Sequence, residues 1–219
     1  MAEIKILKNI MDENLSQAAK NRQWFQSRKI LTLNLIASPG AGKTTFLEQT
    51  IRGLFPKNKL AVIEGDITGD YDAKRIEALG VPVVQINTEG GCHLDAHMID
   101  SVLSSLDLNG LKFLFIENVG NLVCPAEFDL GEDLKVVVLS TPEGHDKPAK
   151  YPLIFSEAQA VVINKIDLLQ AVDFDLALAE HDIRRLNPNV PIFRLSCKTG
   201  EGLDKWLEWL KTQGKGNGI

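Results

Sequence analysis

Cysteine, histidine and long apolar runs are all scarce in this chain. It has three cysteines and four histidines among 219 residues, and no run of 18 apolar residues. Few cysteines, in a chain whose first residues lack the apolar core of a secretion signal, predict reduced thiols and not a disulfide framework. The lack of a long apolar run predicts that no segment spans a membrane. Together these features favour a cytoplasmic location.

Positive charge is not in excess either, because the net charge is −5 at pH 7. We therefore expect no nucleic-acid partner, which would need a basic surface against the phosphate backbone. Apolar residues make up 44% of the chain, enough for a substantial core. The sequence shows no internal repeat and no linker that would divide it, which predicts a single main domain.

Short apolar runs alternate with helical patterns along most of the chain. The runs, which we expect to be strands, cover residues 30–36, 59–63, 81–86, 111–116, 134–139, 160–164 and 190–195. Continuous apolar strands separated by helices are typical of a parallel sheet covered on both faces. The predicted fold is therefore α/β, with a mostly parallel sheet flanked by helices.

Helical patterns fill the intervals between these runs. Helices are predicted over residues 70–79, 95–106 and 173–186, the last with Asp173 as its N-cap. A final helix places Leu203, Trp206, Leu207 and Leu210 on one face, so Trp206 is expected in the core.

The first 28 residues predict a helix of their own. Apolar residues recur there near the helical period, at Leu7, Met11, Leu15, Ala18 and Phe25. We expect this amphipathic helix to pack on the edge of the sheet, and binding of a partner is the alternative role. The main domain then covers residues 29–213, followed by a disordered tail over residues 214–219.

A glycine-rich segment, Ala37-Ser-Pro-Gly-Ala-Gly-Lys-Thr-Thr45, follows the first predicted strand. A strand, a glycine-rich turn and a helix in this order predict a P-loop, whose backbone N–H groups point at phosphate oxygens. Lys43 would reach the β- and γ-phosphates as a catalytic group, and Thr44 would bind Mg²⁺. Ala37 replaces the first glycine of the pattern, and its small side chain should be tolerated. The predicted phosphate-binding residues are Gly40, Ala41, Gly42, Lys43, Thr44 and Thr45.

Two further motifs predict that the nucleotide is a guanine nucleotide. Asn164-Lys-Ile-Asp167 follows a buried strand and matches the guanine-specifying motif of GTP-binding proteins. The Asp167 carboxylate can accept two hydrogen bonds from guanine, whereas adenine offers no such pair of donors. Ser196-Cys-Lys198, after the last strand, resembles the element that meets guanine O6. The predicted base-binding residues are Asn164, Lys165, Asp167, Ser196, Cys197 and Lys198.

Acidic residues at other strand ends are candidates for magnesium binding and hydrolysis. Asp66 and Glu117 follow two strands, and we assign them, with Thr44, to Mg²⁺. Glu117 begins an E-x-x-G segment where most GTPases have aspartate. Asp70 is a candidate catalytic residue near the γ-phosphate, and a solvated residue at a helix start is the alternative. No glutamine stands beside Gly120, which predicts slow intrinsic hydrolysis.

The scarce cysteines and histidines form a candidate metal site. Cys92 and His93 are adjacent before a predicted helix, and Cys124 follows another strand. Two thiolates and an imidazole suit Ni²⁺ or Zn²⁺. Spacing alone does not establish the site, because Cys124 could be a small buried residue and His93 an ordinary polar one.

Taken together, these segments resemble the HypB family of nickel-incorporation GTPases, which act in [NiFe]-hydrogenase maturation. The segments that carry the resemblance are Ser38–Thr44, Glu64–Asp66, Asp72–Ile76, Gly91–Ala96, Glu117–Pro125, Asp146–Pro148, Lys150–Pro152 and Asn164–Asp167. The resemblance implies GTP, Mg²⁺ and either Ni²⁺ or Zn²⁺ as ligands. It places the metal on Cys92, His93 and Cys124 at the interface of a homodimer that forms with GTP. It also implies a HypA-type nickel chaperone and a hydrogenase large-subunit precursor as partners.

The chain departs from many members of this family in one respect. It has neither an N-terminal cysteine-rich site nor a histidine-rich stretch, so nickel storage is not expected. His145 could be a fourth ligand, a residue that supports the ligands from behind, or a solvated loop residue, and Lys147 and Lys150 could reach phosphate across the dimer.

Three alternative functions stay open on the sequence alone. A urease-type nickel GTPase would have Cys-Pro-His, and here Ala126 follows Cys124-Pro125. A chaperone GTPase for cobalamin-dependent mutases would need no Cys-His pair. The third alternative is a nucleotide-dependent scaffold that delivers no metal.

Overall fold

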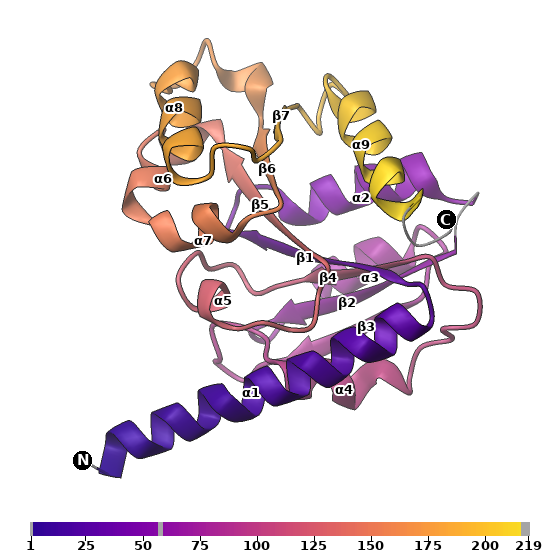
Figure 1. Cartoon of the computed structure of the whole chain (residues 1–219). Helices are drawn as coiled ribbons and strands as arrows, with labels where there is room; N and C mark the ends of the chain where they lie inside the picture. The colour runs from indigo at the N-terminus through magenta and orange to yellow at the C-terminus, as the bar shows by residue number, and fades with distance from the viewer. Residues whose placement is uncertain (1, 57–58, 216–219) are drawn as a thin grey trace.

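A seven-stranded sheet forms the centre of the molecule, in the strand order β3-β2-β4-β1-β5-β6-β7 (Figure 1). The computed structural model describes the backbone of residues 2–56 and 59–215 and the side chains of residues 10–56 and 59–214. Every pairing between neighbouring strands is parallel. The strands are β1 (Leu31–Ala37), β2 (Leu60–Asp66), β3 (Val83–Asn87), β4 (Phe113–Glu117), β5 (Leu134–Ser140), β6 (Ala160–Asn164) and β7 (Ile192–Arg194). All seven predicted strands are present, and the predicted fold class is confirmed.

Helices cover both faces of this sheet. Three of them pack on one face: α2 (Lys43–Leu54), α3 (Tyr71–Glu77) and α9 (Leu203–Lys215). The opposite face is covered by α1 (Ala2–Ser27), α4 (Ala96–Leu103), α7 (Pro152–Glu157) and α8 (Leu176–Leu186). Shorter elements are α5 (Cys124–Glu127), η1 (Thr141–Glu143), α6 (Lys147–Lys150) and η2 (Ile166–Leu168). The short helices α5, α6 and α7 have no counterpart among the predicted helices.

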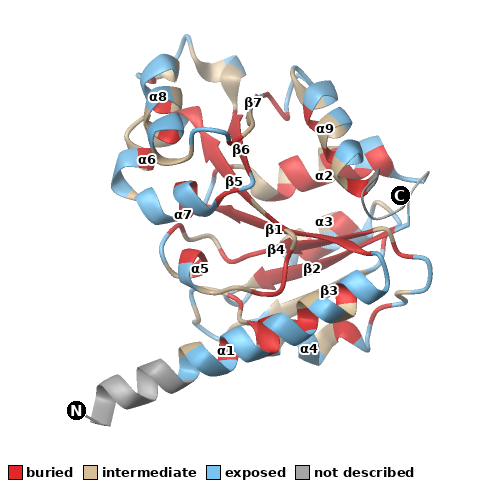
Figure 2. Cartoon of the chain, in the orientation of Figure 1, coloured by how far each residue is buried: buried red, intermediate tan, exposed pale blue. Residues whose placement is uncertain are grey.

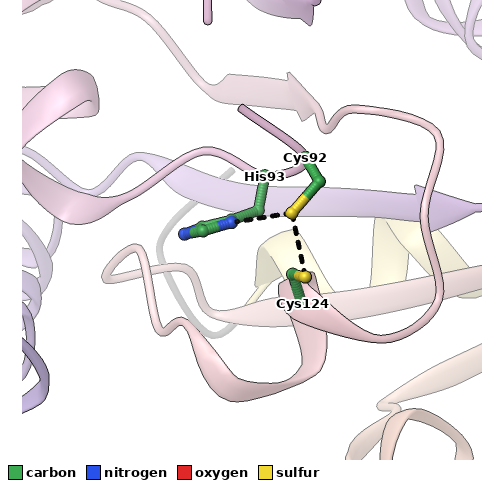
Figure 3. Close-up of side chains that lie close together, drawn as sticks. All are labelled: Cys92, His93 and Cys124. Atoms are coloured by element: carbon green, nitrogen blue, oxygen red, sulfur yellow. Dashed lines mark hydrogen bonds between the residues drawn. The ribbon is translucent and has the colours of Figure 1, made fainter. Parts of the chain in front are cut away.

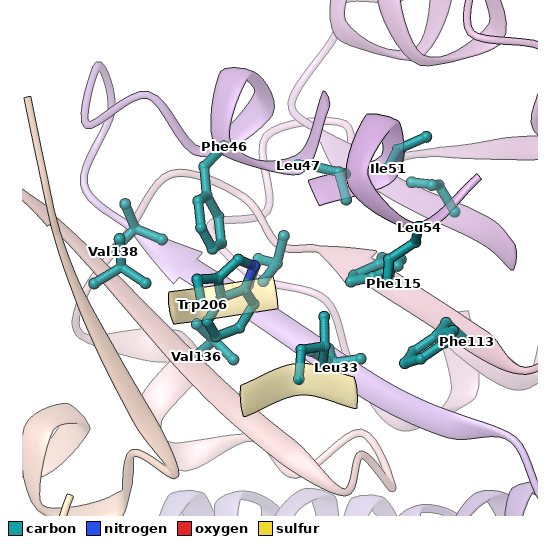
Figure 4. Packing of buried hydrophobic residues seen from close by; sticks show 14 of the residues in the cluster. Leu33, Phe46, Leu47, Ile51, Leu54, Phe113, Phe115, Val136, Val138 and Trp206 are labelled. Carbon is teal, nitrogen blue, oxygen red and sulfur yellow. The ribbon is translucent and has the colours of Figure 1, made fainter. Parts of the chain in front are cut away.

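The core is built from the two faces of the buried strands. The central strands are buried along most of their length, while the outer sides of the helices are exposed (Figure 2). Leu33 of β1 and Phe46 of α2 belong to the cluster under α2 and α9 (Figure 4). Trp206 of α9 is fully buried in this cluster, as predicted, and its indole N–H donates to the Thr50 hydroxyl at 2.9 Å.

The buried side of α1 differs from the predicted apolar stripe. Ala18 and Phe25 are buried as expected, but Leu15 is 53% exposed, and the side chain of Leu7 lies outside the described residues. Asn14 and Asn21 are buried instead. The physical reason is that α1 packs against α4 and against the loop at residues 129–130, whose buried backbone groups need hydrogen-bond partners.

Side-chain amides of α1 supply these missing partners. Asn14 accepts a hydrogen bond from the Ala96 N–H at 2.9 Å and donates to the Asp129 carbonyl at 2.9 Å. Asn21 donates to the carbonyls of Ala96 at 2.8 Å and Leu130 at 3.1 Å. The helix is therefore tied by polar contacts to the start of α4.

Two predicted helix ends need correction. Asp175, not Asp173, caps α8, because its carboxylate accepts the Leu178 N–H at 2.9 Å while Phe174 packs into the core. Residues 214 and 215, which were expected in a disordered tail, belong to α9, and residues 216–219 of that expected tail lie outside the described residues. In the part of the chain that the structure describes, no helix is long and apolar enough to cross a membrane.

Candidate nucleotide and metal sites

The P-loop connects β1 to α2 at the carboxyl end of the sheet. Gly42 has a φ of 90°, and a Cβ there would lie 2.8 Å from the Asn164 amide nitrogen. Both the left-handed conformation and the close contact require glycine at this position. Ala37, in contrast, lies buried within β1, where the strand accepts a small side chain.

Two adjoining cavities lie beside this loop. The first, of about 540 Å³, is lined by the predicted phosphate-binding residues other than Ala41, together with acidic residues of β2 and α3. The second, of about 370 Å³, is lined by the predicted base-binding residues other than Ser196. Gly42, Thr45 and Lys165 line both cavities. The arrangement fits a nucleotide that extends from one cavity into the other, at the strand ends where ligands of such sheets bind.

Asn164 holds three loops of the base cavity together. Its amide nitrogen donates to the Ala41 carbonyl at 3.1 Å. Its amide oxygen accepts the N–H groups of Lys165 at 2.7 Å and Cys197 at 3.2 Å. Lys165 has a φ of 61°, an uncommon conformation for a residue with a side chain, and its ammonium donates to the Gly40 carbonyl at 2.6 Å.

Ser196 positions the predicted base reader. Its hydroxyl donates to the Asp167 carboxylate at 2.6 Å and accepts the N–H groups of Lys198 and Thr199. Asp167 itself is exposed at the cavity, so its carboxylate is available to a base. Burial raises the pKa of the neighbouring Cys197 thiol to about 12, which makes Cys197 a structural residue and not a reactive one.

A cluster of carboxylates lies at the phosphate end. Oxygen atoms of Glu64, Asp72 and Glu117 lie within 4.8 Å of one another. Glu117 accepts the Thr44 hydroxyl at 2.6 Å and lies 3.4 Å from the Lys43 ammonium. Burial, followed by the charge of Glu117, raises the pKa of Glu64 to about 8. Burial also raises the pKa of Glu117.

The cluster differs from the predicted acidic set. Asp66 lines the cavity, but its carboxylate accepts the N–H groups of Ile67 and Gly69 and lies outside the cluster. Asp70 is exposed, pairs with Lys74 at 2.6 Å and does not line the phosphate cavity. The reason is register: Glu64 of β2 lies opposite Glu117, the last residue of β4, whereas Asp66 lies two residues further along β2, past the end of β4.

Arg75 is a site residue that the sequence patterns did not single out. Its guanidinium donates to the Asp72 carboxylate at 3.1 Å, to the Thr45 hydroxyl at 3.1 Å and to the two carboxylate oxygens of Glu48. It thereby joins α3 to α2 and holds Asp72 beside the phosphate cavity. Asp72 and Arg75 are three residues apart on a predicted helix, and this spacing could have predicted their ion pair.

The three predicted metal ligands lie together (Figure 3). The Cys92 sulfur is 2.9 Å from the Cys124 sulfur and 3.5 Å from His93 Nδ1. Cys92 is exposed and the other two are half-buried, so the cluster opens to the surface. Burial lowers the pKa of His93, whose ring packs on Phe128 with centroids 3.9 Å apart, and this favours the neutral imidazole that a metal needs.

His145 has a structural role away from the sulfur atoms. Its Nδ1 accepts the Asp175 N–H at 3.2 Å, and its ring meets Phe174 edge to face at the start of α8. The cluster of potential ligands in the described residues does not include it. His145 is half-buried, and the structure does not place it with the three predicted ligands.

The parallel sheet, the P-loop and the base-reading loops define a P-loop nucleotide-binding protein. Residues 31–194 match the family model described as CobW/HypB/UreG, nucleotide-binding domain. The chain is 50% identical to the hydrogenase maturation factor HypB of Azotobacter vinelandii, over 96% of this chain and 69% of that protein. It is also 50% identical to HypB of Escherichia coli, over 97% of this chain and 73% of that one.

A solved structure agrees with these sequence relatives. HypB from Helicobacter pylori, in complex with nickel, superposes with a TM-score of 0.87 at 38% identity, covering 94% of this chain and 96% of that one. The chain belongs to the HypB family of hydrogenase maturation factors, which confirms the resemblance drawn from its motifs.

Proposed function

We propose that this protein is a GTP-hydrolysing nickel metallochaperone that assists nickel insertion into the large subunit of a [NiFe]-hydrogenase. One observation carries the proposal: two thiols and an imidazole form one cluster, and one segment, residues 117–124, contributes both to this cluster and to the lining of the P-loop cavity. Nickel is the cargo, and Zn²⁺ suits the same ligand set. The proposed location of the protein is the cytoplasm, where Cys92 and Cys124 stay reduced.

Guanine specificity rests on the loop geometry of the base cavity. Asp167 is exposed at the cavity and held by Ser196, so its second oxygen and remaining lone pairs can accept two donors from the base. Adenine would leave this charged acceptor unpaired, at a cost of about 1–3 kcal/mol. We therefore propose GTP, and not ATP, as the nucleotide.

The residues at the phosphate end fit Mg²⁺. One carboxylate oxygen of Glu64 and one of Glu117 are buried without a hydrogen-bond partner. The negative charges of these two carboxylates also repel each other. A divalent cation satisfies such oxygens and offsets their repulsion, and oxygen ligands are those that Mg²⁺ prefers. Thr44 and Glu117 would hold the ion, with Glu64 and Asp72 close by. The ion would neutralise charge on the phosphates, while Lys43 binds the same oxygens.

We further propose that the nucleotide controls the metal site. GTP would order the loops around Asp66 and Glu117, as γ-phosphate sensors do, and favour a homodimer in which the cysteines of two copies approach each other. Hydrolysis would then change the ligand geometry and release nickel to its client. A HypA-type nickel chaperone would supply the metal.

Phosphate release measured with GTP and with ATP, each with and without Mg²⁺, tests the enzymatic part of this proposal. The expected result is slow release that requires both GTP and Mg²⁺. No release above background, with GTP still bound, would favour a scaffold whose nucleotide is structural. Equal turnover of ATP would contradict the assignment of the base cavity.

A further inference from the structure

Residues 117–124 join the two sites through one short stretch of chain. At its start, Glu117 contacts Thr44 and Lys43 in the phosphate cavity. At its end, Cys124 belongs to the sulfur cluster. In between, Gly120 packs so closely on the P-loop that a Cβ there would lie 3.1 Å from the Pro39 side chain. The segment that carries Cys124 therefore contacts the phosphate cavity at its start and the P-loop in its middle.

Asn118 connects this segment to the loop of Cys92 and His93. It is fully buried at the end of β4, and its amide oxygen accepts the N–H groups of Leu94 at 3.1 Å and Val119 at 2.9 Å. Its amide nitrogen donates to the Asn34 amide oxygen at 3.2 Å, which fixes the orientation of the group. Leu94 follows His93 directly, and Asn118 follows Glu117 directly. The hydrogen bond between Leu94 and Asn118 therefore links the backbone next to His93 to the backbone next to Glu117.

Asn121 makes a second connection to the same loop. Its amide nitrogen donates to the Cys92 carbonyl at 3.2 Å, and its amide oxygen accepts the Val123 N–H at 2.9 Å. The contact with Val123 shapes the turn that precedes Cys124. The peptide groups on both sides of His93 are thus held by the segment that carries Cys124.

We propose that Asn118 and Asn121 are positioning residues that couple the nucleotide state to the relative placement of Cys92, His93 and Cys124. This inference rests on the proposed function, since it supposes that nucleotide changes nickel affinity. A ligand shifts a conformational equilibrium only through its different affinities for the two states. The two amides make the opposing ligand loops move as one unit, so that a change at Glu117 alters the geometry of all three ligands. Coupling of this kind is typically worth about 5–150-fold in affinity.

The test measures Ni²⁺ affinity by competition with a chromophoric chelator, once with GDP and once with a non-hydrolysable GTP analogue. The proteins are the unmodified chain, Asn118→Ala, Asn121→Ala and the control Asn187→Ala. Asn187 donates to the carbonyls of Ser156 at 3.2 Å and Ala158 at 2.9 Å, so its loss removes a similar amide far along the chain from both sites. The readout is the ratio of the two affinities, which a purely structural loss of stability leaves unchanged.

The expected result is a ratio well away from one in the unmodified chain and in Asn187→Ala, and a ratio at least about threefold closer to one in the other two variants. A ratio that persists in Asn118→Ala and Asn121→Ala overturns this inference and leaves the proposed function standing. A ratio of one in the unmodified chain refutes the proposed coupling itself. If Asn118→Ala does not fold, Asn121→Ala decides the outcome, because Asn121 is only half-buried.

Discussion

Replacement of Glu64 by glutamine should stabilise the protein without nucleotide while weakening the binding of Mg²⁺ and GTP. Glu64 is buried, lies opposite Glu117 in the sheet and keeps one carboxylate oxygen without a hydrogen-bond partner. Glutamine has nearly the same shape and carries no charge. The substitution therefore removes the repulsion within the cluster and also removes a negative charge that attracts the cation held by Thr44 and Glu117.

The size of this effect follows from the pKa of Glu64, which rises from 4.5 to about 8 in the folded protein. Because the pKa of Glu64 is higher in the folded protein than in the unfolded chain, protonation of this carboxyl group stabilises the fold. This stabilisation is complete at a pH below the unfolded pKa and is lost as the pH increases through the folded pKa. Each pH unit above 4.5 costs about 1.4 kcal/mol, which gives about 3 kcal/mol at neutral pH. Water that enters the open cavity reduces this energetic cost. Glu64→Gln should therefore increase the free energy of unfolding by about 1–3 kcal/mol at neutral pH.

Urea denaturation at about pH 5 and about pH 8, with a chelator and without nucleotide, measures the gain. Glu64→Gln should match the unmodified chain near pH 5 and exceed it near pH 8, whereas the exposed control Glu77→Gln should differ at neither. With Mg²⁺ and GDP, the same variant should bind nucleotide at least about tenfold more weakly. Equal or lower stability of Glu64→Gln near pH 8 would refute this account of the carboxylate cluster.

Three other substitutions test the remaining parts of the two sites. Cys124→Ala should lower Ni²⁺ affinity by at least about 100-fold, seen by chelator competition, and leave GTP binding unchanged; unaltered nickel affinity would reject Cys124 as a ligand. Asp167→Asn should weaken GTP by about 1.5–3 kcal/mol and favour a xanthine nucleotide in fluorescence titrations, and unchanged GTP affinity would exclude Asp167 as the base reader. Gly42→Ala should cost about 1–2 kcal/mol of stability, because of its φ of 90°, and abolish nucleotide binding; a stable variant that binds GTP would disprove the conformational requirement.

The sheet could be predicted because its strands are buried on both faces. Such strands read as short apolar runs, and the predicted run 160–164 has the same bounds as β6. The helices α5 and α6 could not be predicted, because four residues are too few to show a helical period. The burial of the polar face of α1 could not be predicted for a different reason. Asn14 and Asn21 are buried because they bind backbone groups that are distant in the sequence.

Some residues of the candidate sites could also be predicted from the sequence, and others could not. The P-loop and the base-reading motif are local patterns, so Lys43 and Asp167 could be found from neighbouring residues alone. The choice between Glu64 and Asp66 depended on the register between β2 and β4, which the sequence does not display. The sulfur cluster depended on topology, because Cys92 follows β3 and Cys124 follows β4, and β2 lies between these two strands.

The most direct test of the central claim, that nucleotide state controls the metal site, is a titration of the unmodified protein with Ni²⁺ by calorimetry. One titration contains GDP and Mg²⁺, and the other contains a non-hydrolysable GTP analogue and Mg²⁺. We expect dissociation constants that differ by about fivefold or more between the two titrations. Identical affinities in the two nucleotide states would contradict control of the metal site by nucleotide.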